Sequence, residues 1–140
     1  MKRLIYKISI VASLISLTIA CSKDDSNNNN STDPRDKFVG SWLCKETSHL
    51  HGSTTYNVTI SLNSTNSIQV YINNFYGANV KPYGVVANNY VTISDQSLGS
   101  FPHVSGSGSM SSSNTSTINW NYYVNDGADI DTCSAVYTKQ

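Results

Sequence analysis

The sequence predicts an all-β fold in which about eight antiparallel strands form an up-and-down barrel over residues 37–140. Three observations predict it. Apolar and polar side chains alternate with a period of two from Phe38 onward, turns rich in Asn, Ser and Gly recur every 8–14 residues, and no segment of this region has the spacing of an amphipathic helix. A sandwich of two sheets is the alternative arrangement of the same strands.

The first half of the domain supplies four expected strands. Each carries apolar residues at every second position, and they lie near residues 38–44, 56–62, 68–72 and 80–86. Pro82 lies within the last of these, which indicates an edge strand or a bulge because proline cannot donate a sheet hydrogen bond.

The second half supplies four more strands after a turn at residues 87–89. They lie near residues 91–93, 104–110, 118–124 and 133–137. Gly106 and Gly108 alternate with serines, which predicts a closely packed or sharply bent strand. The sequence Asn-Asp-Gly at residues 125–127 predicts a hairpin turn before the last strand.

Charge is sparse in this domain, and its scarcity excludes one class of partner. From Lys37 onward the sequence has 4 lysines, no arginine and 5 acidic residues in 104 positions, far below the average charged fraction of about 25%. Four lysines cannot build a face that neutralises several phosphates, so nucleic acid is not an expected partner. The abundant Ser, Thr, Asn, Tyr and Val are typical of a β-protein outside the cytoplasm.

Cys44 and Cys133 are expected to form a disulfide that joins the first strand to the last. If Trp42 lies opposite Ala135 in an antiparallel pair, the two cysteines lie opposite each other, within the Cα distance that a disulfide spans. Such a bridge would close the sheet into a barrel without exposed strand edges. The alternative is two buried free thiols.

The motif Phe38-x-Gly40-x-Trp42 begins the first strand, and the last strand ends in Ala135-x-Tyr137-x-Lys139. This arrangement resembles the lipocalin-like (calycin) small barrels of many Bacteroidota lipoproteins. The resemblance implies that Trp42 closes the base of the barrel and that Gly40 occupies a tight position beside it.

Residues 1–20 are expected to be a cleaved lipoprotein signal peptide. Lys2 and Arg3 give a positive start, and the 13 residues 8–20 are mostly apolar, a length typical of a signal peptide and short for a spanning helix. Residues 17–21 (LTIAC) resemble a lipobox, which implies that Cys21 becomes the lipid-bearing N-terminus. An uncleaved anchor or an ordinary signal peptide is the alternative.

The residues after Cys21 are expected to be a tether. Residues 21–26 (CSKDDS) resemble the export signal of surface lipoproteins in Bacteroidota, which implies display outside the outer membrane; a generic acidic tether is the alternative. Residues 27–36 (NNNNSTDPRD) contain too few apolar side chains to fold by themselves. We therefore expect residues 21–36 to be disordered.

No constellation of residues predicts catalysis, a metal site or a cofactor. His49 and His51 lie in an expected loop without a nearby carboxylate or cysteine. The three aspartates within residues 126–131 are assigned to a hairpin turn, because their spacing differs from that of a calcium-binding loop. Carboxylates for glycoside hydrolysis would have to include Glu46, placed at a strand end, or Asp95. An enzyme is not expected.

Tyr71, Phe75, Tyr76 and Tyr83 are the expected contacts for a ligand or partner. They are predicted on faces opposite the core or in loops, where aromatic rings beside Asn and Gln suit stacking on sugars or contact with a protein. The inward positions mostly carry large side chains, which predicts a filled interior.

The expected role is non-catalytic binding or envelope architecture by a lipid-anchored lipoprotein of the outer membrane, exposed at the cell surface. A lipocalin-like carrier of a small apolar ligand is the alternative. The expected partners are the outer membrane, through the lipid on Cys21, and a glycan, an apolar ligand or an envelope protein.

Overall fold

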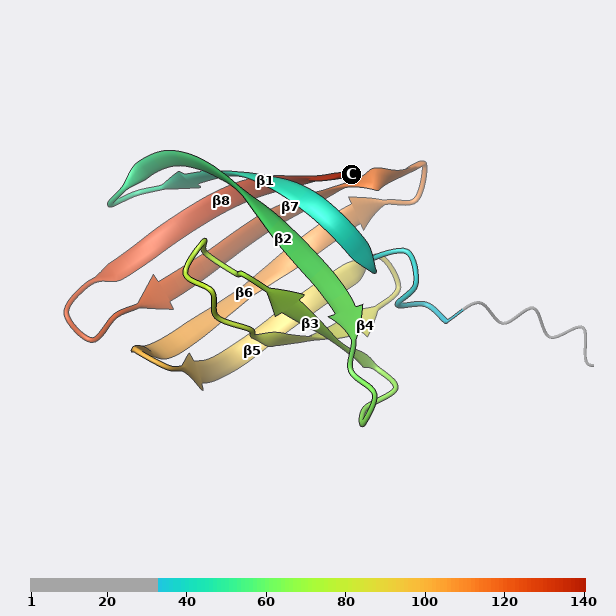
Figure 1. Cartoon of the computed structure of the whole chain (residues 1–140), viewed down its shortest axis with the longest axis horizontal. Coiled ribbons are helices and arrows are strands. Elements are labelled where there is room, and N and C mark those ends of the chain that lie inside the picture. The colour runs from blue at the N-terminus through green and yellow to red at the C-terminus, as the bar shows by residue number, and fades with distance from the viewer. Residues whose placement is uncertain (1–32) are drawn as a thin grey trace, which may run out of the picture. The chain divides into compact units, whose positions relative to one another are not determined.

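A computed structural model describes residues 33–140 of the chain. Eight strands follow one another, each joined to the next by a turn or loop (Figure 1). Their bounds are β1 Gly40–Ser48, β2 Gly52–Leu62, β3 Gln69–Asn73, β4 Tyr83–Ala87, β5 Tyr90–Leu98, β6 Phe101–Ser111, β7 Asn114–Asn125 and β8 Ile130–Lys139. The expected signal peptide, the lipobox with Cys21, and residues 21–32 of the expected tether lie outside the described residues.

The eight strands form one closed antiparallel barrel in sequence order. β1 pairs with β2 on one side and with β8 on the other, as Figure 1 shows, so the sheet has no open edge. The predicted all-β, up-and-down barrel is therefore confirmed, and the sandwich is excluded. Within residues 33–140 no helix is long and apolar enough to cross a membrane.

The two ends of the barrel differ in their connections. The β1–β2, β3–β4, β5–β6 and β7–β8 connections lie at one end, which we call the open end. Residue 33, the C-terminus and the other three connections lie at the opposite end, which we call the closed end (Figure 1).

Trp42 lies wholly buried near the closed end, where the chain enters the barrel. Its indole Nε1 donates a hydrogen bond of 2.9 Å to the carbonyl oxygen of Phe38, and Nζ of Lys139 lies 5.3 Å from its ring centroid. Gly40 has a φ of 135°, which side chains rarely adopt. Gly40 and Trp42 are thus part of the packing that covers this end.

Two aromatic residues of β7 pack directly against glycines of β6. Gly106 pairs with Tyr122, and Gly108 pairs with Trp120. A Cβ at Gly108 would lie 2.6 Å from the Trp120 indole, and a Cβ at Gly106 would lie 2.4 Å from Cβ of Tyr122. The close packing predicted for this strand is therefore present, because a larger residue would collide with the Trp120 ring at position 108 and with the backbone of β7 at position 106.

The ordered region begins earlier than residue 37. Arg35 is 7% exposed, and its Nη1 donates to the carbonyl oxygens of Asn63, Asn66 and Gln69 at 2.9–3.2 Å. Its Nη2 also lies 2.6 Å from a carboxylate oxygen of Asp33. Residues 33–36, the last four of the predicted tether, are therefore ordered, because Arg35 binds the β2–β3 connection and pairs with Asp33.

The predicted disulfide is wrong, because Cys44 and Cys133 are both buried free thiols. Both face inward, but the β1–β8 register places Tyr137 opposite Cys44 and Ser48 opposite Cys133. A separation of four residues along a strand is about 13 Å, well beyond the roughly 7 Å between Cα atoms that a disulfide can span. Burial raises the pKa of Cys44 to about 12, so its thiol stays protonated at neutral pH. Backbone pairing alone closes the barrel.

Candidate functional site

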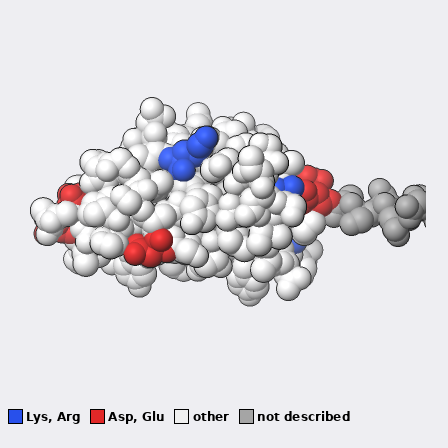
Figure 2. All heavy atoms as spheres, turned by 90° about the horizontal axis from the view of Figure 1, so that it is seen from below, with Lys and Arg blue, Asp and Glu red and all other residues white. Residues whose placement is uncertain are grey.

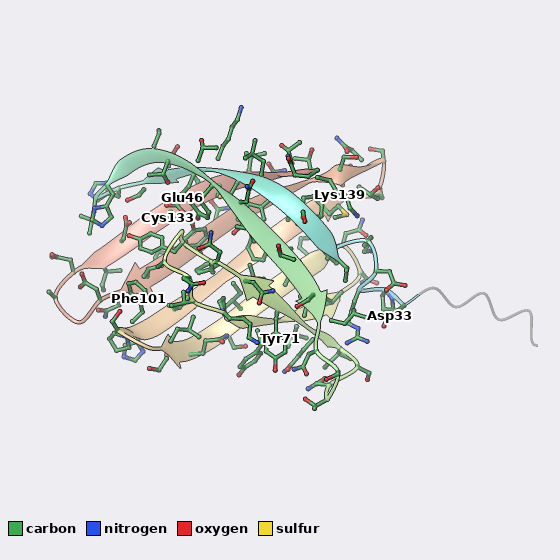
Figure 3. The ribbon with its side chains drawn as sticks, in the orientation of Figure 1. Asp33, Glu46, Tyr71, Phe101, Cys133 and Lys139 are labelled. Atoms are coloured by element: carbon green, nitrogen blue, oxygen red, sulfur yellow. The ribbon has the colours of Figure 1, made fainter. Side chains whose placement is uncertain are left out.

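The open half of the barrel directs polar side chains inward. Glu46 follows Cys44 by two residues on β1, so it keeps the inward parity of that strand, and it is only 4% exposed. Figure 3 shows Glu46 and Cys133 in the half of the barrel that carries the β1–β2 connection. Tyr56 of β2 and the fully buried Tyr122 of β7 meet Glu46 there.

The two tyrosines bind one oxygen of the Glu46 carboxylate and leave the other nearly free. The hydroxyls of Tyr56 and Tyr122 both donate to Oε2. The only contact to Oε1 is from Oγ1 of Thr54, at the long distance of 3.5 Å. Because a carboxylate oxygen accepts about two hydrogen bonds, Oε1 has acceptor capacity that the described residues do not use.

Glu46 is a buried carboxylate without a basic partner. Neither of the two ion pairs within residues 33–140 involves it. Burial raises the pKa of Glu46, and the nearby charge of Asp131 adds to this effect, while the hydrogen bond from Tyr56 and the proximity of His51 oppose it. An unpaired charge at such depth is costly unless something compensates it.

A second buried carboxylate is Asp131 of β8, whose pKa shifts in the opposite direction to that of Glu46. It is 2% exposed and accepts hydrogen bonds from Ser48 Oγ, the Tyr76 hydroxyl and the backbone N–H of Leu50, at 2.5, 2.6 and 3.1 Å. Burial alone would raise the pKa of Asp131, but these donors outweigh it and lower the pKa to about 2. Asp131 is therefore a satisfied, ionised structural group.

The β3–β4 loop folds across the open half and contributes Phe75 and Tyr76. Phe75 was predicted as an exposed contact, and this was wrong: it is fully buried with its ring 4.6 Å from that of Tyr122. Tyr76 has a φ of 59°, an unfavourable conformation for a bulky residue. Its hydrogen bond to Asp131 and its edge-on contact with Phe101, at 5.8 Å between centroids, hold it there.

A pocket of about 330 Å³ opens beside these residues. Its volume lies within the range of roughly 300–1,000 Å³ that is typical of small-molecule sites. Glu46 lines this pocket together with Thr54, which contacts its Oε1, and Tyr56, which donates to its Oε2. The lining consists of Glu46, His51, Thr54, Tyr56, Tyr76 and Gly77.

A second hollow, of about 650 Å³, lies on the outer face of β1, β7 and β8. It is larger but shallow, and mostly short hydroxyl and amide side chains line it, including Thr47, Asn121 and Ser134. It contains no carboxylate or amine among the described residues that line it. We therefore place the candidate site at the open end, where the buried Glu46 carboxyl group lines the cavity.

Charges divide unevenly between the ends of the barrel. In Figure 2 one end carries acidic atoms without basic ones, while acidic and basic atoms lie together at the other end. Asp126 and Asp129 lie in the β7–β8 connection at the open end. Arg35 and Lys139 lie at the closed end, where their contacts are to the β2–β3 connection and to Trp42. The pocket lining itself carries one carboxylate, Glu46, and no lysine or arginine.

Tyr71 and Tyr83, two further predicted contacts, lie apart from this pocket. They pair across β3 and β4 and point away from the interior, and Tyr83 is 37% exposed. Lys81 covers the Tyr71 ring, with Nζ 4.4 Å from its centroid. Of the four predicted contact residues, only Tyr76 lines the pocket.

Glu46 and Asp131 were not predicted as site residues. Glu46 was placed at a strand end and Asp131 in a turn, but β1 continues to Ser48 and β8 begins at Ile130. The alternation of inward-facing and outward-facing positions along each strand could have identified both residues. Glu46 continues the inward series of Cys44, and Asp131 continues that of Cys133.

The histidines form no metal site in the described region. His49 and His51 are exposed in the β1–β2 connection, and His103 pairs with Asp95 at 2.9 Å on the exposed surface. Within residues 33–140 no group of three or more His, Cys, Asp or Glu side chains could hold a metal ion.

Comparisons with known proteins bear on the fold. No protein-family model and no curated protein matches the chain. A solved structure of EF1p2_mFAP2b bound to DFHBI has a TM-score of 0.54 and 15% identity, covering 78% of this chain and 100% of that chain. The structure of a redesigned beta barrel has a TM-score of 0.53 and 11% identity, covering 77% of this chain and 96% of that chain. The chain thus has the fold of these small β-barrels, in agreement with the lipocalin-like barrel expected from sequence.

Proposed function

We propose that this protein is a non-catalytic binding module that takes a small polar molecule into the pocket at the open end of its barrel. The observation that carries the proposal is the position of Glu46, a buried carboxylate that lines a pocket of about 330 Å³ and has one oxygen, Oε1, with only a long hydrogen bond from the described residues. Binding sites combine such a cavity with a few well-placed polar groups. The barrel of EF1p2_mFAP2b, bound to DFHBI, supports the view that this fold can hold a small molecule.

The packing favours a polar ligand over the apolar ligand that was the alternative expectation. Trp42, Trp120 and Tyr137 are at most 1% exposed and occupy the closed half, where an apolar ligand would need space. The remaining space lies at the mouth, next to a carboxylate and hydroxyl groups. An apolar molecule there would leave Glu46 buried without compensation, which is unfavourable.

The binding test is an NMR titration of the purified, ¹⁵N-labelled protein with choline, n-butylamine, glucose, N-acetylglucosamine, succinate and laurate. We expect at least one polar compound to shift the amide signals of Thr54, Tyr56 and Gly77, which belong to the pocket. The amides of Asn121 and Ser134 on the outer face serve as the internal control. Binding of laurate alone, or shifts confined to the outer face, would contradict the proposal.

We also propose that a lipid on Cys21 holds the module at the outer membrane, with the barrel outside the cell. Three features of the sequence support this location: the apolar run before residue 21, the small residue Ala20 and the acidic residues after Ser22. When cells are grown with labelled palmitate, the label should be incorporated into the natural chain and not into the Cys21→Ala variant. Protease added to intact cells should degrade the barrel. A labelled Cys21→Ala variant would exclude this lipid site, and full protection from protease would exclude surface display.

A further inference from the structure

We propose that the ligand of the open-end pocket is a compact organic cation whose ammonium group pairs with Glu46. This inference rests on the proposed binding function and names the class of molecule bound. It begins from the observation that Glu46, 4% exposed, has no basic partner among the described residues. A cation in the pocket would supply the missing opposite charge.

The geometry of the carboxylate assigns one oxygen to this role. Tyr56 and Tyr122 donate to Oε2 and orient the group, while Oε1 receives only the 3.5 Å contact from Thr54. The N–H groups of an alkylammonium could donate to Oε1 and to the Thr54 hydroxyl together. A neutral hydroxyl or amide ligand could also donate to Oε1, but it would leave the buried charge uncompensated.

The distribution of charge favours entry of a cation. Lys45, next to Glu46 on β1, points outward, and Lys81 lies over Tyr71 on the outer surface. Neither side chain reaches the pocket lining. The basic residue in that lining is His51, which is exposed. A lining that contains the Glu46 carboxylate and no lysine or arginine would favour cations over anions.

The walls of the pocket suit an organic cation. Tyr56 and Tyr76 contribute aromatic rings to the lining, and aromatic rings attract ammonium groups through their negative faces. Calcium takes about six to eight oxygen ligands, whereas the pocket offers a single carboxylate. A volume of about 330 Å³ holds a molecule the size of choline or n-butylammonium.

The test compares each cation with a neutral molecule of the same shape. Binding of choline and of its uncharged isostere 3,3-dimethylbutan-1-ol to the purified full chain is measured by calorimetry at neutral pH, and n-butylammonium is measured against butan-1-ol. We expect n-butylammonium to bind about tenfold to a hundredfold more tightly than its neutral partner, the range of a charge-assisted hydrogen bond. Choline has no N–H to donate, so its preference over its isostere should be about tenfold, through charge attraction and contact with the aromatic rings. This comparison needs no variant, so it does not depend on the folding of one.

A variant pair then assigns the preference to Glu46. Glu46→Gln keeps the shape of the side chain and removes its charge, so it should lose the preference for the cation and still bind the neutral isostere. Asp95→Asn removes a carboxylate that is exposed and pairs with His103, so it should keep the preference. Thermal unfolding of each variant confirms that the barrel is intact.

The outcomes separate this inference from the binding function on which it rests. Equal binding of cation and isostere overturns the cation class and leaves the pocket as a binding site. Calcium binding that Glu46→Gln abolishes, without any binding of choline or n-butylammonium, also overturns the class. If no compound shifts the pocket signals in the NMR titration and none binds in the calorimetric experiment, the binding function itself is overturned.

Discussion

The closed and open halves of the barrel use the same strands and the same inward parity, yet they bury different chemistry. Along β1 the inward series passes from Trp42 through Cys44 to Glu46, and along β8 it passes from Tyr137 to Asp131. The closed half fills its space with aromatic rings, whereas the open half encloses carboxylates and hydroxyls beside a pocket. The position of a residue in the alternation along its strand decides whether its side chain enters the barrel. In the open half, residues of the strands and their connections donate the hydrogen bonds that make the burial of Glu46 and Asp131 possible.

The largest expected effect tests the closed half. Trp120→Ala would remove a ring that is 1% exposed and packs on Gly108, so we expect a loss of about 3–5 kcal/mol in the free energy of unfolding. Tyr123→Ala, three positions further along β7 and 54% exposed, is the matched control and should cost below about 1 kcal/mol. Urea denaturation followed by circular dichroism measures both. Similar losses in the two variants would mean that the closed half is not a tightly packed core.

The next effect separates the two buried carboxylates of the open half by pH. The pKa of Asp131 is lowered from 3.8 to about 2, so its stabilising effect is present above pH 3.8 and is lost as the pH falls toward 2. We expect this loss to reach about 2 kcal/mol in the natural chain, and Asp131→Asn should remove that part of the pH dependence.

Glu46 should act in the opposite sense. Because its pKa is raised above 4.5 in the folded protein, its contribution to stability is full below pH 4.5 and is lost as the pH rises through the folded value. Its surroundings include Tyr56, Tyr122, Thr54, His51 and Asp131. Glu46→Gln should therefore flatten the stability profile above pH 4.5 and leave the acidic limb unchanged. A variant profile that matches the natural one in this range would rule out a buried, ionising Glu46.

The smallest expected effect concerns the loop that covers the open half. Tyr76→Phe removes the hydroxyl that donates to Asp131 and should cost about 1 kcal/mol. Amide hydrogen exchange within residues 74–80 should become faster, because that bond helps to hold the left-handed conformation of Tyr76. Tyr83→Phe, on the outer surface, should change neither quantity. Unchanged exchange in Tyr76→Phe would mean that other contacts fix the loop.

The alternation of apolar and polar residues was sufficient to predict the barrel, because a strand's parity follows from local sequence. It was not sufficient to predict register. A shift of four residues between β1 and β8 preserves parity, so Cys44 and Cys133 both face inward as predicted and still lie too far apart to pair. Register depends on the lengths of turns and on bulges such as those between Ile93 and Leu98, which the apolar pattern does not reveal.

The candidate site was harder to predict for a different reason. Polar residues near the ends of strands resemble turn residues in the sequence. Glu46 was therefore placed at a strand end and Asp131 in a turn, although both occupy inward-facing positions of their strands. The partners that make their burial possible, Tyr56, Tyr76 and Tyr122, come from three other segments and meet only in the folded barrel. The burial of Phe75 has the same origin, since the β3–β4 loop turns back over the interior through residues with positive φ.

The central claim is that Glu46 is a buried carboxylate facing a pocket that takes a cation, and the sequence offers a direct way to test it. Glu46 is the single glutamate among the 140 residues, so protein labelled with ¹³C-glutamate gives one side-chain carboxyl signal. Followed against pH, this signal should report a pKa above the ordinary 4.5, and choline should lower that pKa because a bound cation favours the ionised form. A pKa at 4.5 that choline leaves unchanged would contradict the account.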